Sequence, residues 1–163
     1  MRSCTAMNSF PRPLEFVPGL WDALMRDLYK RGEQTRETGA FLCSSRDSSP
    51  VCRWITYDEV DPASVEFPYI RLASAAFGRL AEVCSAESLL VVADIHTHPG
   101  VPRQSRSDRR HPMIGLAGYV ALIAPRYARG DVRPRDVSFN FYCGDYRWRS
   151  YFGPDAGALI VAN

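Results

Sequence analysis

Helix-type and strand-type patterns alternate along this chain. Apolar residues recur at helical spacing in two segments, residues 18–31 and 71–85, which we expect to form the two main helices. Shorter runs rich in β-branched and aromatic residues predict strands at 13–17, 38–44, 51–60, 89–95, 118–124, 137–142 and 146–152. This order is typical of an α/β (α+β) domain whose mixed, mainly antiparallel sheet is flanked by two main helices.

The pattern indicates one domain. A chain of 163 residues with 46% apolar and 12% aromatic residues is long enough to bury a substantial core. We expect residues 1–12 to be a flexible leader, residues 13–153 to form a single domain, and residues 154–163 to be a C-terminal tail. The sequence leaves the structure of that tail open.

Composition and charge bear on the partners and the cellular location of the protein. The net charge of +2 gives no indication of a nucleic-acid partner. Arginines gather in 103–110 and 126–135, either as solvated loops or as a rim for a carboxylate-bearing partner. The five cysteines form no C-x-x-C pair, the first ten residues lack the apolar core of a signal peptide, and no apolar run could span a membrane. We therefore expect a cytoplasmic protein with free thiols and no membrane partner.

Two histidines stand at the end of the apolar run 88–93. In a strand, residues i and i+2 share a face, so His96 and His98 point the same way. Pro99 and Gly100 then end the strand, and the returning chain can bring Asp108 near both imidazoles. Two histidines and one carboxylate, with a position left for water, are typical of catalytic zinc.

These residues resemble a known motif. His96-Thr97-His98-Pro99 followed by Ser105-Arg106-Ser107-Asp108 is similar to the signature of the JAMM/MPN+ (JAB) zinc metallopeptidase family, in which His-x-His-Pro precedes Ser-x-x-Asp. The family also has an upstream glutamate with a glycine close behind it at the start of an early strand. The run from Glu37 to Leu42 resembles that element. Six residues separate His98 from Ser105 where the family pattern has seven, so the connecting loop is one residue shorter.

The resemblance implies a compact MPN/JAB-like domain and a role for each motif residue. His96, His98 and Asp108 would hold Zn²⁺, Glu37 would act as general base, and Ser105 would donate a hydrogen bond to the oxyanion. The implied activity is that of a peptidase or isopeptidase that removes or matures a ubiquitin-like protein at its C-terminal tail. In bacteria, such members resemble partners of E1-like and E2-like proteins, some of them in antiphage defence.

Several alternatives remain open at this point. The protein could be a catalytically silent MPN-type scaffold, or a peptidase that processes sulfur-carrier proteins. Ser105 also suits a helix N-cap, and Asp94 could orient one of the histidines. His111 could contact the substrate or the ligand shell, although a surface histidine before a proline is the simpler interpretation.

Overall fold

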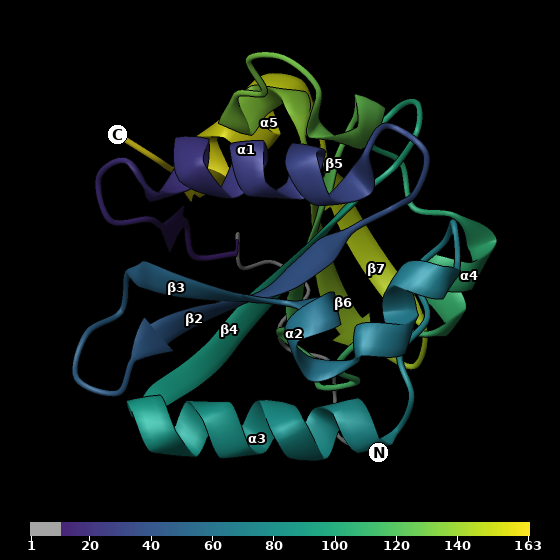
Figure 1. Cartoon of the computed structure of the whole chain (residues 1–163). Helices are drawn as coiled ribbons and strands as arrows, with labels where there is room; N and C mark the ends of the chain where they lie inside the picture. Colours follow the sequence, from purple (N-terminus) through teal and green to yellow (C-terminus); the bar gives the residue numbers. More distant parts are fainter. Residues whose placement is uncertain (1–10) are drawn as a thin grey trace.

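The computed structural model describes residues 11–163. Residues 1–10, drawn in grey in Figure 1, lie outside the described part, and most of the expected leader falls among them. In the described residues the fold is mixed α/β. A six-stranded sheet runs in the order β3-β2-β4-β5-β6-β7 and is antiparallel except between β4 and β5. The strands are β2 (Gly39–Ser45), β3 (Val51–Thr56), β4 (Leu89–Thr97), β5 (Val120–Ala124), β6 (Ser138–Gly144) and β7 (Arg147–Tyr151).

Helices cover both faces of this sheet (Figure 1). On one face lies α1 (Leu20–Gly32) with α5 (Gly153–Leu159), and on the other lies α3 (Ala75–Glu87). The short helices α2 (Tyr57–Val60) and α4 (Arg106–Arg110) lie at the same end of the sheet. The mixed, mainly antiparallel sheet and its two main helices confirm that part of the predicted fold class.

Residues of β2 alternate between two apolar cores, as the pleat of a strand requires. Ala40 and Leu42 pack on the α1 side, whereas Phe41 and Cys43 pack on the α3 side. Phe41 pairs with Asp94 across β2 and β4, so Asp94 faces the α3 side as well. Asp94 and His96, two residues apart on β4, therefore both lie on the α3 face of the sheet.

The predicted strand 51–60 was wrong beyond Thr56, because a helix begins there. The Thr56 backbone N–H donates to Glu59 Oε2 at 2.7 Å, and the two residues form a capping box that starts α2. The apolar residues Tyr57 and Val60, which extended the strand pattern, are instead buried on one side of this helix.

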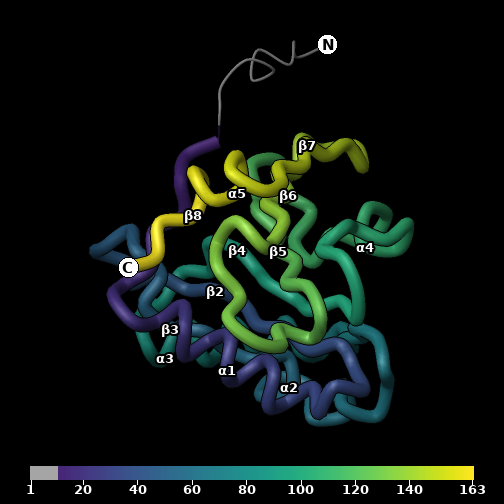
Figure 2. The backbone as a smooth tube through the Cα atoms, turned by 90° about the horizontal axis from the view of Figure 1, so that it is seen from above, coloured from purple at the N-terminus to yellow at the C-terminus, as the bar shows by residue number. Residues whose placement is uncertain are grey.

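The segment left as a C-terminal tail is part of the fold. Its first residues form α5, and β8 (Ile160–Val161) pairs in parallel with β1 (Leu14–Glu15). In Figure 2 the yellow end of the chain, with β8, lies beside the purple segment that follows the grey residues. Leu159 and Ile160 are buried in the core beneath α1. The predicted end of the domain at residue 153 is therefore wrong, because the residues after it pack in the same core as the rest of the domain.

The other compositional expectations concern cysteines and membrane spans. Of the cysteines in residues 11–163, all are free, and Cys43 is buried while Cys52 is exposed. No helix in this part of the chain combines the length and the apolar character that a membrane crossing requires.

Candidate metal centre

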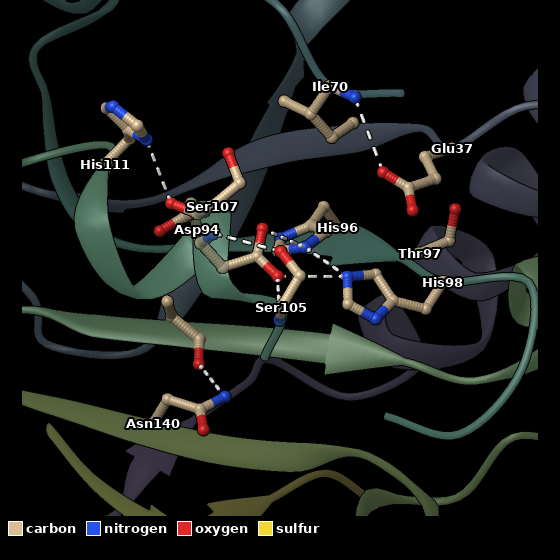
Figure 3. A network of polar contacts seen from close by, with 12 residues as sticks. Glu37, Ile70, Asp94, His96, Thr97, His98, Ser105, Ser107, His111 and Asn140 are labelled. Atoms are coloured by element: carbon tan, nitrogen blue, oxygen red, sulfur yellow. Dashed lines mark hydrogen bonds and ion pairs between the residues drawn. The ribbon is translucent and has the colours of Figure 1, made fainter. Parts of the chain in front are cut away.

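The two histidines of the motif are fixed by backbone pairing. His96 is the penultimate residue of β4, where it pairs with Gly39 on β2 and Ile123 on β5. His98 continues the chain, and its N–H donates to Ala124 O at 2.9 Å. Both side chains are buried, and their Nε2 atoms lie 3.0 Å apart (Figure 3). Strand alternation therefore turns the two imidazoles toward one point, as predicted.

Asp108 reaches the histidines from α4. Ser105 is the N-cap of this helix, and its Oγ accepts a hydrogen bond from the Asp108 N–H at 3.1 Å. In return, the Ser105 N–H donates to Asp108 Oδ2 at 2.6 Å, which completes a capping box. This box fixes the carboxylate of Asp108, so the loop that is one residue shorter than the family pattern still delivers it to both imidazoles.

The three side chains have the geometry of a metal site. Asp108 Oδ1 lies 3.4 Å from His96 Nε2, and Asp108 Oδ2 lies 3.2 Å from His98 Nε2. Nitrogen and oxygen ligands held tetrahedrally about 2.0–2.1 Å from a zinc ion are about 3.3 Å from one another. The three potential ligand atoms all lie within 4.8 Å of one another. The donor set therefore could hold a metal ion.

Glu37 lies beside this group because of the β2–β4 register. Gly39 pairs with His96, and the Thr97 N–H donates to Thr38 O at 2.8 Å. Continuing this antiparallel register by one more residue sets Glu37 across from His98, with both side chains on the same face. Figure 3 shows Glu37 on one side of the imidazole pair and Ser105 on the other.

The loop after α2 also holds Glu37. The Glu37 N–H donates to Pro68 O at 2.9 Å, and Glu37 Oε2 accepts a hydrogen bond from the Ile70 N–H at 3.4 Å. The side chain is half-buried. Its carboxylate is thus held by one oxygen through a long hydrogen bond.

Burial, hydrogen bonds and neighbouring charges shift the pKa values of Asp108 and His96. Burial opposes ionisation of Asp108, but hydrogen bonds to His96 and His98 outweigh it and hold the pKa of this carboxyl far below its ordinary value. Burial would likewise lower the pKa of His96, yet the hydrogen bond and charge of Asp108, with the charges of Asp94 and Glu37, raise that pKa. The carboxylate is therefore ready to bind a cation, and a proton on His96 competes with it.

A second carboxylate, Asp94, is buried next to the ligands, with only 2% of its surface exposed. Its Oδ2 accepts a hydrogen bond from the Tyr57 hydroxyl at 2.9 Å. Burial raises the pKa of Asp94 to about 6, against the opposing effects of the His96 charge and the hydroxyls of Tyr57 and Tyr119. The Tyr119 hydroxyl interacts electrostatically with this carboxyl but does not meet hydrogen-bond geometry. Asp94 is thus held by a tyrosine from outside the motif.

A cavity of about 240 Å³ opens beside the metal ligands. His96, Asp108 and Asp94 border it on one side. His111 borders it as well, is exposed, and has its Nδ1 3.1 Å from Ser107 O. His111 is therefore a surface histidine, as the simpler interpretation predicted, and it also borders the cavity.

The structure brings together the predicted metal ligands and places Glu37 and Ser105 beside them. Sequence reasoning considered Asp94 only as a partner of a histidine, whereas its described hydrogen bond is to Tyr57. Tyr57 and Trp148 were missed altogether as site residues. They are far from the motif in sequence, and only the Thr56-x-x-Glu59 capping pattern hinted that the chain turns back at Tyr57.

Comparison with known proteins gives a fold relationship. No protein-family model matches the sequence. The chain is similar to protein DSY2949 from Desulfitobacterium hafniense, known from a solution structure, with a TM-score of 0.55 and 15% identity. The match covers 85% of this chain and 88% of that protein's chain. At this level of identity the similarity concerns the fold alone.

Proposed function

We propose that this protein is a zinc-dependent peptidase or isopeptidase with an MPN/JAB-like fold. Its substrate would be a ubiquitin-like protein, removed or matured at its C-terminal tail, with E1-like and E2-like proteins as partners in the same pathway. The observation that carries the proposal is the grouping of His96, His98 and Asp108 within 4.8 Å, with Glu37 across from His98 in strand register. The JAMM-like motif supports the class of substrate.

The chemistry follows from the chain's own side chains. A zinc ion held by His96, His98 and Asp108 would supply Lewis acidity to the substrate carbonyl and make water easier to deprotonate. The Glu37 carboxylate would accept the proton from the attacking water and return it to the leaving amine. Because Ser105 Oγ uses a lone pair for the Asp108 N–H, its own O–H hydrogen is available to the developing oxyanion.

A variant of the general base tests this proposal. Ubiquitin and a panel of ubiquitin-like proteins, each carrying a fluorescent C-terminal amide, would be offered to the zinc-loaded protein. Glu37→Gln should retain one zinc per chain and lose about 100- to 10,000-fold in cleavage rate. Glu82→Gln, the same change at an exposed position on α3, should match the wild type.

Two outcomes would count against the proposal. Equal cleavage by Glu37→Gln and the wild type would remove Glu37 from the mechanism. A zinc-loaded wild type that is inert toward the whole panel, and toward sulfur-carrier fusions, would instead favour the silent scaffold.

A further inference from the structure

The cavity beside the metal centre has a floor built from two adjacent strands. Asp94 on β4 pairs with Ala121 on β5, so the two side chains lie on one face. The side chain of Ala121 ends at a methyl group and borders the cavity. It therefore leaves space above the sheet directly beside the Asp94 carboxylate.

Two buried oxygen atoms at this cavity have no hydrogen-bond partner among the described residues. Asp94 Oδ2 is used by Tyr57, but Asp94 Oδ1 is free, and so is Gln104 Oε1. Both residues border the cavity. Each of these atoms is an acceptor that lacks a donor, so the cavity favours a ligand that carries hydrogen-bond donors.

The cavity walls are apolar and aromatic. Phe77 from α3, Met113 and Trp148 from β7 border it. The Trp148 indole N–H donates to Arg109 O at 3.0 Å, which holds the ring against the end of α4. Such walls suit an aliphatic chain, and aromatic faces also attract a cation at its end.

The charge of the cavity is acidic. Among residues 11–163, its ionisable lining residues are Asp94, His96, Asp108 and His111, and no lysine or arginine of this part borders it, although α4 alone carries three exposed arginines. Asp94 adds a second carboxylate beside Asp108 at the floor of the cavity, with its Oδ2 accepting the Tyr57 hydroxyl and its Oδ1 unpaired among the described residues.

We propose that this cavity is a specificity pocket for a lysine side chain of the substrate, next to the bond that is cut. The ammonium would donate to Asp94 Oδ1 and Gln104 Oε1, while the aliphatic stem would lie against Phe77, Met113 and Trp148. A lysine ammonium has three donors on a flexible four-carbon stem, which matches these acceptors and walls. The inference rests on the proposed function, because it takes the ligand to be part of a polypeptide substrate.

A direct binding measurement tests the pocket without catalysis. The zinc-loaded protein would be titrated with n-pentylamine, which is protonated at pH 7, and with its neutral counterpart 1-pentanol. The Trp148 indole N–H resonance, assigned with Trp148→Phe, reports on binding. We expect pentylamine to bind at least about tenfold more tightly than pentanol, as for a hydrogen bond between charged groups. We expect the same preference for pentylamine in chelator-treated protein, which would show that the pocket binds the amine independently of the metal ion.

Replacing aspartate by asparagine, a residue of nearly equal shape, tests the contribution of the Asp94 carboxylate charge. Asp94→Asn keeps an acceptor for the Tyr57 hydroxyl and should abolish the preference for the amine. Asp47→Asn, at an exposed position in the turn after β2, should keep it. A third variant, Ala121→Leu, fills the space above the sheet and should weaken the binding of both pentylamine and pentanol. Equal binding of amine and alcohol, or an unchanged preference in Asp94→Asn, would overturn the pocket.

Substrate variants separate this inference from the proposed function. In any fusion that is cleaved, lysine beside the scissile bond should give a kcat/KM about tenfold above methionine in the wild type, and no advantage in Asp94→Asn. Amine binding without cleavage of any fusion would overturn the peptidase and leave a cation site. Cleavage with neither lysine preference nor amine binding would overturn the pocket and leave the peptidase.

Discussion

Thr97 Oγ1 accepts a 3.0 Å hydrogen bond from the backbone N–H of Thr38. With the bond from the Thr97 N–H to Thr38 O, it closes a pair of contacts between the residue before β2 and the last residue of β4. Thr38 Oγ1 in turn donates to Leu28 O on α1 at 3.0 Å. The segment that carries Glu37 is therefore fixed to the strand that carries His96 and leads directly into His98.

Replacing Thr97 by valine tests this fixation. The loss of Oγ1 leaves the Thr38 N–H without its partner, so the free energy of unfolding should fall by about 1–3 kcal/mol in a denaturant titration. Cleavage should fall by about 100-fold because Glu37 loses its position, while zinc content stays at one per chain. Thr97→Ser keeps the oxygen and should stay close to the wild type. A valine variant with full activity would show that this contact does not position Glu37.

Alanine variants of His98 and His111 provide a test of metal binding and its matched control. Zinc at about 100 times its dissociation constant should stabilise the wild type by about 2.7 kcal/mol, seen as a higher Tm that a chelator reverses. His98→Ala should lose the stabilisation. His111→Ala, the same change at an exposed position that does not meet Asp108, should keep it. Zinc stabilisation of equal size in both variants would exclude His98 as a ligand.

Gly39 is a position where a methyl group cannot fit. A Cβ there would overlap the Tyr57 ring and lie 2.7 Å from Ile95 O, although the glycine has an ordinary backbone conformation. Gly39→Ala should therefore destabilise the protein by about 1–3 kcal/mol in a denaturant titration. It should also disturb Asp94, which depends on the Tyr57 hydroxyl. Gly78→Ala, on α3 with open space around it, should be neutral or stabilising by up to about 1 kcal/mol.

The C-terminal segment should contribute to the stability of the whole domain. Leu159 is 1% exposed in the core, so Leu159→Ala should cost about 2–5 kcal/mol of unfolding free energy. Val161→Ala, two residues on but 40% exposed, should cost much less. Thermal unfolding of the two variants, compared with the wild type, measures the difference. Similar Tm values for all three proteins would mean that the segment is not part of the cooperative unit.

Local patterns were sufficient for much of this fold. The apolar run of β2 and the helical spacing of α1 can each be recognised within one element, and the His96–His98 pair needed only the two-residue period of a strand. Ser105 as an N-cap followed from its residue type, and the helix it starts does carry Asp108. These parts were predictable because neighbouring residues determine them.

The remaining parts depend on partners distant in sequence. The α5 segment has Pro154 in its first turn, a usual position for proline in a helix, but its apolar stretch is too short to distinguish a packed helix from a tail. Strand β8 forms only because β1 lies beside it. Likewise, Asp94 and Tyr57 are 37 residues apart, and their hydrogen bond depends on α2 turning back over Gly39.

The pairing of β1 with β8 also affects how the chain is made. Phe16 and Trp21 share a core with Leu159 and Ile160, which leave the ribosome last among them. This core is therefore incomplete until Leu159 and Ile160 have been made, and contacts of such long range form slowly. We expect the nascent chain to need chaperone protection in this interval, and to become resistant to proteases only once residue 161 has emerged.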